Sequence, residues 1–203
     1  AIGSVMNYFL NLILYSFSKL AVAVFGAYFK VQSMAFMPVF GLNNGMIPII
    51  SYNYGAQKPD RMKRTMKLGV MVGCSIMVFC LAIMQVFPGQ ILKIFDATDE
   101  MLLMGIPAVR IMSTAFIFAG FSVTCSGMFQ AVGKGVYSMI VSMARQLFVI
   151  LPVAYFLSKA MNSVNGVWAA FPIAEVFSVI ISTIFLLRVY KKIVKPMESV
   201  QRD

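Results

Sequence analysis

The sequence has no histidine and few charged residues, and both shortages narrow the classes of protein to consider. Only 12% of the 203 residues are charged, whereas soluble domains carry about a quarter. Histidine is the commonest general acid or base in enzymes, so its absence argues against an enzyme. The three cysteines, Cys74, Cys80 and Cys125, form no CxxC pair. We therefore predict no zinc site, no disulfide framework and no bound cofactor.

What the sequence has instead is a succession of long apolar stretches. Hydrophobic residues make up 60% of the chain, and the mean hydropathy is +0.85. Residues 68–87 contain no charge over 20 positions, which is enough helix to cross the hydrocarbon of a bilayer. Apolar runs without period-2 alternation favour helices over a barrel. The net charge of +10 comes from basic residues clustered at the ends of these stretches, so we predict no nucleic-acid partner.

These stretches predict an all-α membrane protein with six transmembrane helices. Their expected ranges are about 2–17, 24–53, 68–87, 102–131, 135–157 and 166–188. The fourth range is expected to be one continuous helix. Together the six make one membrane unit over residues 1–190. Residues 191–203 form a basic cytoplasmic tail, which we expect to be frayed or to lie on the anionic inner leaflet.

Lysine and arginine set the predicted orientation. Eleven of them fall on one side of the membrane: Lys58, Arg61, Lys63, Arg64, Lys67, Lys134, Arg188, Lys191, Lys192, Lys195 and Arg202. Five fall on the other side: Lys19, Lys30, Lys93, Arg110 and Lys159. The positive-inside rule places the larger group in the cytoplasm. We therefore predict a multi-pass protein of the plasma membrane with both ends of this chain cytoplasmic, as an even number of spans requires.

Two charged residues lie deep inside the last two predicted spans. Arg145 is roughly 18 Å below the outer face and Glu175 roughly 15 Å, at the rise of an α-helix. An isolated charge at such a depth costs at least ~2.5–3.5 kcal/mol. Because the two spans are antiparallel neighbours joined by a short loop, we predict that the charges form an ion pair or share a polar cavity. A packing role and a role in substrate or ion handling both remain open.

Three blocks of sequence carry a resemblance to a known family. They are FMPVFGLNNGMIPIISYNYGAQKPDRMKRTMKLG (36–69), SGMFQAVGKGVYSMIVSMARQLFVILPVAYFLS (126–158) and VNGVWAAFPIAEVFSVIISTIFLLRVYKK (164–192). In content and order they resemble the multidrug and toxic compound extrusion (MATE) transporters. The first block ends in a turn, Tyr52 to Ala56, that matches the family's signature. There we expect Gly55 to end its helix in the left-handed C-cap position.

The resemblance implies a twelve-helix transporter of two six-helix lobes, of which this chain matches the second. It implies export of cationic or amphipathic compounds in exchange for Na⁺ or H⁺ by alternating access. The implied partners are these small molecules, membrane lipid and the amino-terminal lobe. We expect the substrate cavity to include Asn7, Asn11, Asn43, Asn44, Arg145 and Glu175. No site for the coupling ion is identified, because the acidic residues that some members place in the first and fourth helices of this lobe are absent.

Other classes of function remain as alternatives. A lipid-linked oligosaccharide flippase of the wider superfamily has similar lobes, but its cavity should be markedly basic. A non-transporting membrane assembly subunit is a further alternative, and the polar residues inside the spans argue against it. An intramembrane enzyme is disfavoured, because the chain has neither histidine nor a clustered pair of aspartates.

Overall fold

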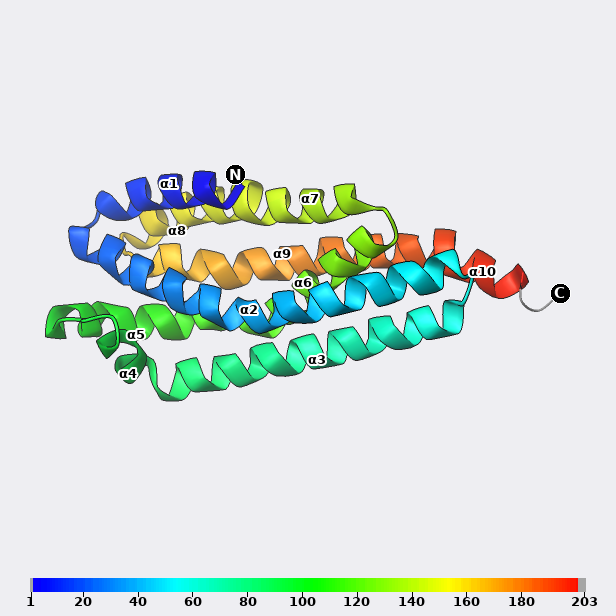
Figure 1. Ribbon diagram of the computed structural model, residues 1–203. Helices are drawn as coiled ribbons and strands as arrows, with labels where there is room; N and C mark the ends of the chain where they lie inside the picture. Colours follow the sequence, from blue (N-terminus) through cyan, green and yellow to red (C-terminus); the bar gives the residue numbers. More distant parts are fainter. Residues whose placement is uncertain (1, 201–203) are drawn as a thin grey trace.

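The computed structural model describes residues 2–200, which form helices joined by short turns and include no strand. Arg202, counted above among the cytoplasmic basic residues, lies outside the described residues, as does the rest of the tail beyond residue 200. The helices, two of them the π-helical segments η1 and η2, are α1 (Ile2–Tyr15), α2 (Lys19–Gly55), α3 (Pro59–Val86), α4 (Pro88–Lys93), α5 (Asp99–Ser113), α6 (Phe116–Ala131), α7 (Gly135–Met143), η1 (Ala144–Ile150), α8 (Leu151–Met161), α9 (Asn165–Val189), η2 (Tyr190–Val194) and α10 (Lys195–Val200) (Figure 1).

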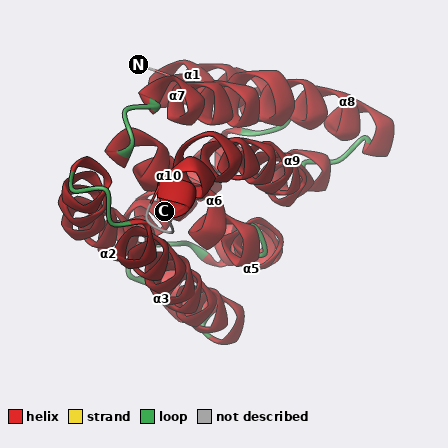
Figure 2. Ribbon diagram, turned by 90° about the vertical axis from the view of Figure 1, so that its right-hand side faces the viewer, coloured by secondary structure: helices red, strands yellow, loops and turns green. Residues whose placement is uncertain are grey.

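The helices pack around a central pair. In the end-on view, α6 and α9 lie in the middle, α1, α7 and α8 lie on one side, and α2 and α3 lie on the other (Figure 2). The largest fully buried side chains include Trp168 of α9, Phe116 of α6 and Tyr28 of α2. The predicted all-α membrane architecture is confirmed.

The lengths of the helices show which of them can cross a membrane. Within residues 2–200, four continuous helical stretches are long and apolar enough to span: Lys19–Gly55, Pro59–Val86, Gly135–Met161 and Asn165–Ser199. The pair α5 and α6 makes a fifth if it counts as one bent span. Helix α1 is apolar but has 14 described residues, whereas a full crossing takes about 20. It is therefore shorter than the span expected at 2–17.

The helix expected to be continuous over 102–131 is broken, which corrects the prediction. Helices α5 and α6 meet at an angle of 49° around Thr114 and Ala115. The Thr114 hydroxyl donates a hydrogen bond to the carbonyl of Ile111, 2.6 Å away, and such local bonds compete with the helical pattern. From α3, the Gln85 side-chain amide donates to the carbonyl of Arg110 at 2.8 Å. A neighbouring helix thus satisfies backbone that the break exposes.

The expected end of α2 is correct in place but differs in its mechanism. Helix α2 ends at Gly55, yet the residue in the left-handed conformation is Gln57, with φ of 54°. The Lys58 N–H donates to the Asn53 carbonyl and the Gln57 N–H to the Tyr54 carbonyl, the pattern of a Schellman motif. Gly55 is therefore not the left-handed cap, and the same motif at the end of α6 uses Gly133, with φ of 73°.

The start of the basic tail is helical rather than frayed. The chain continues from α9 through η2 into α10, up to Val200. Val194 and Met197 are buried, and Val194 belongs to the same apolar cluster as Met62 near the start of α3. Lys63 contacts Glu198 of α10 as well as Asp60, at 2.5 and 3.0 Å. Apolar burial and this ion pair hold the helical part of the tail against α3.

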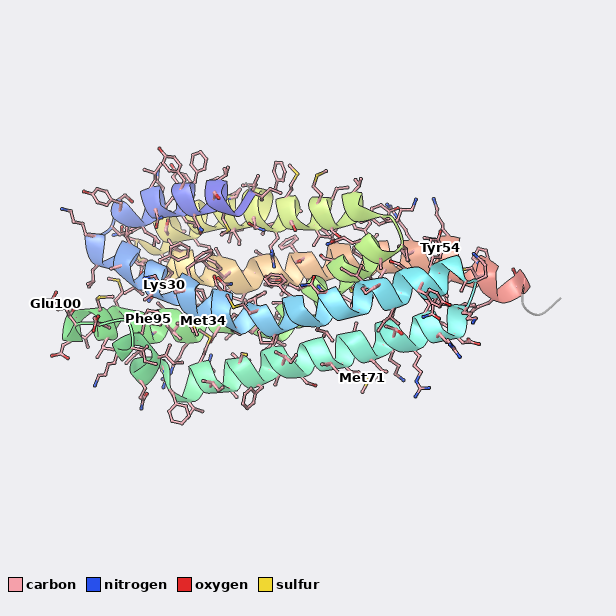
Figure 3. The ribbon with its side chains drawn as sticks, viewed as in Figure 1. Lys30, Met34, Tyr54, Met71, Phe95 and Glu100 are labelled. Atoms are coloured by element: carbon pink, nitrogen blue, oxygen red, sulfur yellow. The ribbon has the colours of Figure 1, made fainter. Side chains whose placement is uncertain are left out.

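Turns of the bundle gather at two ends, and the basic residues divide between them as predicted. The α2–α3 turn, the α6–α7 turn and α10 lie at one end, and the α1–α2, α8–α9 and α4–α5 turns lie at the other (Figure 1). At the second end the Lys30 ammonium lies 5.8 Å from the centre of the Phe95 ring (Figure 3). Most basic side chains of residues 2–200 thus belong to turns or to the outer parts of helices, while Lys30 and Arg145 lie well inside helical stretches.

Helices α3 and α6 approach each other unusually closely because glycines line their contact. A Cβ atom added at Gly120 would lie 2.9 Å from both the Gly73 carbonyl oxygen and the Cys74 Cα. Both of those atoms belong to the backbone of α3 and cannot rotate away. Small residues at a helix contact allow this approach, which strengthens packing inside a membrane.

Candidate functional site

Arg145 and Glu175 form the ion pair that the sequence predicts. The Arg145 Nη1 donates to Glu175 Oε1 across 2.7 Å, from η1 to α9. Glu175 is buried, with 6% of its surface exposed, and the Arg145 side chain is 20% exposed. Each charge offsets the cost of burying the other, because a charge-assisted hydrogen bond joins them. The second carboxylate oxygen, Oε2, is buried and has no hydrogen-bond partner among the described residues.

The Arg145 side chain is presented by a π-helical segment in the middle of a span. Segment η1 also carries Gln146, and short π segments inside α-helices are frequent at functional sites. Pro152 follows η1 and cannot donate a backbone hydrogen bond to the preceding turn. The π-helical segment η1 therefore lies next to Pro152, where the α-helical hydrogen-bond pattern is already interrupted.

A polar chamber lies between α2, α6, α7–η1 and α9. Its volume is about 350 Å³, and ten of its fifteen lining residues are polar or charged. None of the fifteen is acidic, and Arg145 is the only cation among them. The polar members are Asn43, Asn44, Ser122, Ser126, Gln130, Ser138, Ser142, Arg145, Gln146 and Ser178.

Hydrogen bonds fix several of these polar side chains. The Ser138 hydroxyl donates to the Ser126 carbonyl at 2.7 Å, and the Ser126 hydroxyl donates to the Ser122 carbonyl at 3.1 Å. The Asn43 amide nitrogen donates to the Val123 carbonyl at 2.9 Å. Gly127 makes room for that amide, since a Cβ there would lie 2.7 Å from it. The serine oxygens and Asn43 Oδ1 therefore keep lone pairs that can accept hydrogen bonds.

An apolar pocket adjoins the polar chamber. It has a volume of about 360 Å³, and α1, α2, η1 and α9 line it. It takes in four phenylalanines, Phe29, Phe36, Phe40 and Phe171, together with Glu175. Four residues line both spaces: Phe36, Phe40, Arg145 and Gln146. The ion pair thus lies where a polar space meets an aromatic one.

The structure brings together four of the six residues predicted for the substrate cavity. Asn43 and Asn44 line the polar chamber, Glu175 lines the apolar pocket and Arg145 lines both. Asn7 and Asn11 of α1 line neither space, although the neighbouring Gly3 and Met6 line the apolar pocket. Their expected place in a cavity between two lobes stays a prediction, since this chain forms one lobe.

The sequence analysis missed the small polar residues of the chamber. Ser122, Ser126 and Gln130 recur at every fourth position in α6. Ser138, Ser142 and Gln146 do the same across α7 and η1. Residues four apart share one face of a helix, so two consecutive spans with such a polar stripe could have predicted a polar space between them.

The fold and the site define a helical membrane lobe that holds polar and aromatic binding space at depth, as membrane transporters do. The MatE family model matches residues 1–156, and the chain belongs to this family. It is 26% identical over 159 residues to "Multidrug export protein MepA" of Staphylococcus haemolyticus (strain JCSC1435), which covers 78% of this chain and 35% of that protein. The family resemblance is thereby confirmed, and the chain is not classed as an enzyme.

Solved structures of MATE transporters have the same fold. The chain superposes on an outward-facing MATE family transporter of the MOP superfamily with a TM-score of 0.87 and 19% identity, covering 97% of this chain and 44% of that one. An inward-facing conformation gives a TM-score of 0.87 and 19% identity, covering 97% and 45%. The chain therefore spans under half the length of these relatives, as one lobe would.

Proposed function

We propose that this chain is the second lobe of a secondary transporter that exports cationic or amphipathic compounds in exchange for Na⁺ or H⁺. The relative named above is called a multidrug export protein, and one lobe of the fold superposes on both outward- and inward-facing transporters. Alternating access between two lobes is consistent with these likenesses. The proposed partner is an amino-terminal lobe of the same transporter.

The apolar pocket carries this proposal. Its phenylalanine rings offer adaptable apolar contact and can also attract a cation through their faces. Glu175 Oε2 is buried without a partner among the described residues, and Glu175 lines this pocket. A buried carboxylate oxygen costs free energy unless a donor or a cation meets it. Arg145 also lines this pocket but meets only Oε1 of the carboxylate. An amphipathic cation would supply an apolar body for the rings and a positive charge for the side of the carboxylate that Arg145 leaves unpaired.

The test is transport by the protein as its gene encodes it, purified and placed in liposomes. We expect a Na⁺ or H⁺ gradient to drive the uptake or release of the fluorescent cation ethidium, and an ionophore that collapses that gradient to stop it. Glu175→Gln should lower the rate about tenfold, because a hydrogen bond to a charged group contributes about 1.5–3 kcal/mol. Size-exclusion chromatography checks that the variant remains folded.

The matched control is Ser182→Ala, on the same helix. Ser182 is buried and lines neither the polar chamber nor the apolar pocket, so transport should be unchanged. Ethidium movement that is equal with and without both gradients would refute ion-coupled export. A folded Glu175→Gln protein with an unchanged rate would remove Glu175 from the proposed site.

The proposal includes a membrane orientation. The end formed by the α2–α3 turn and α10 carries most of the lysines and arginines, so we place it in the cytoplasm of the plasma membrane. A cysteine introduced at Gln57, in the exposed α2–α3 turn, should react with a membrane-impermeant maleimide only in inverted vesicles. Labelling from the outside of intact cells would reverse the orientation.

The flippase alternative receives less support from the site. A cavity for a lipid-linked oligosaccharide should be markedly basic. Among the described residues, Arg145 is the only cation that lines the polar chamber or the apolar pocket, and it is paired. The ion pair alone could serve packing in an assembly subunit without transport activity, but the polar and aromatic cavities beside it favour a transporter. The exporter therefore stays the preferred proposal.

A further inference from the structure

The polar chamber offers chemistry that export of an amphipathic cation does not use. The proposed function places the positive charge of a ligand beside Glu175 in the apolar pocket, whereas none of the described residues that line the polar chamber is acidic. The chamber has nearly the same volume as its neighbour, and Arg145 and Gln146 line both spaces. On the basis of the proposed function, the chamber is left to a part of the substrate other than its positive charge.

The balance of charge excludes an ionic group there. The only charged lining residue, Arg145, is already neutralised by Glu175 at 2.7 Å. A cation in the chamber would lie near Arg145 without a carboxylate of its own. An anion would give one guanidinium two negative partners. An unbalanced charge is costly inside a membrane protein, whereas an uncharged group leaves the pair neutral.

The hydrogen-bonding groups of the chamber suit a group that both donates and accepts. Asn43 Oδ1 is a buried acceptor and Ser178 Oγ is a buried hydroxyl, and neither has a partner among the described residues. Both residues line the chamber. Buried polar atoms are nearly always satisfied, and the chamber is the polar space that these two residues adjoin. Arg145 has further N–H donors beyond the one that binds Glu175.

We propose that the polar chamber binds an uncharged hydrogen-bonding group of the transported molecule, a carboxamide or a hydroxyl, while its aromatic body fills the apolar pocket. Such a group accepts from Ser178 or Arg145 and donates to Asn43. Phe36, Phe40 and Gln146 line both spaces, so a single molecule can reach from one into the other. The site therefore selects molecules by a neutral polar end as well as by positive charge.

The experiment compares three dansyl probes that share one linker carrying a quaternary ammonium, which meets the requirement for a cation in the apolar pocket. They differ only at the end of that linker, which is a carboxamide, a trimethylammonium or a carboxylate. Dissociation constants are measured by dansyl fluorescence on the purified full-length protein in detergent micelles. We expect the carboxamide probe to bind most tightly. Ser178→Ala should weaken its binding about three- to tenfold, the effect of one hydrogen bond, and should leave the trimethylammonium probe unchanged.

Ser182→Ala is the matched control, because Ser182 is also a buried serine of α9 whose hydroxyl has no partner among the described residues, but it lines neither space. Size-exclusion chromatography confirms that both variants remain folded. The assignment is overturned if a probe with a charged end binds most tightly, or if the two serine variants act alike. If liposomes move ethidium but the probes show no preference for the carboxamide, the assignment of the polar chamber is wrong and the proposed export stands. Ser178-dependent carboxamide binding without ion-driven transport would do the reverse.

Discussion

One half of this lobe is close-packed and the other half is open. Between α3 and α6 the backbones meet directly at Gly73 and Gly120. Between α2 and the α7–η1 segment, at the level of Arg145, two cavities remain. Lipid tails are as apolar as leucine, so helices in a membrane associate by close packing and by polar contacts. The close-packed half of this lobe relies on the first means, and the open half relies on polar contacts around its two cavities.

The strongest test of the comparison removes the polar contact of the open half. Arg145→Leu should destabilise the protein by about 3–5 kcal/mol, because it leaves the buried Glu175 carboxylate without its partner. The measurement is the midpoint of thermal unfolding, followed as loss of the monodisperse peak in size-exclusion chromatography.

The rescuing variant exchanges the two charges. Arg145→Glu combined with Glu175→Arg should recover much of the loss from either single reversal, since the pair is restored in the opposite sense. A double variant no more stable than the single ones would mean that the pair does not determine the stability of the open half.

The second test overpacks the close-packed half. Gly120→Leu should cost about 1–3 kcal/mol or more, because its side chain would meet the backbone of α3 at Gly73 and Cys74. Gly45→Leu is the matched control, since no atom lies within 4 Å of a Cβ at Gly45. Equal midpoints of thermal unfolding for the two variants would show that the glycine contact is not close in solution.

The smallest effect is expected at the end of the close-packed half, where α10 meets α3. Lys63→Met removes the contacts to Glu198 and Asp60, and exposed ion pairs contribute little. We expect Lys63→Met to lower the unfolding midpoint by less than Arg145→Leu or Gly120→Leu does. Added salt should make this shift smaller still. A shift that is insensitive to salt would mean that the contact is not ionic.

The same contact predicts how stability depends on pH. The hydrogen bonds to Glu198 and Asp60 raise the pKa of Lys63 above its ordinary value. The contribution of Lys63 is therefore fully present below the ordinary lysine pKa, and it is lost only as the pH rises through the raised one. The difference between wild type and Lys63→Met should stay constant across neutral pH and shrink in strong alkali.

Some features of the site followed from the sequence and others did not. The Arg145–Glu175 pair was predictable, because the helical rise alone puts both charges at one depth in adjacent spans. The break at Thr114 was not predictable, because the apolar residues around it are typical of one continuous helix. The hydrogen bond from Gln85 to the Arg110 carbonyl, near this break, comes from another span. The π segment η1 was not predicted either. The polar stripe from Ser122 to Gln130 was visible in the sequence as a period of four.

The internal neutrality of the ion pair has an electrical consequence. A single elementary charge that crosses a membrane potential gains or loses ~2.3 kcal/mol per 100 mV. Arg145 and Glu175 are joined at 2.7 Å and would travel together whenever this lobe moves. They carry no net charge through the field, so the membrane voltage does no work on the centre of the lobe. Any voltage dependence of the proposed transport would then come from the travelling solute or from charges elsewhere.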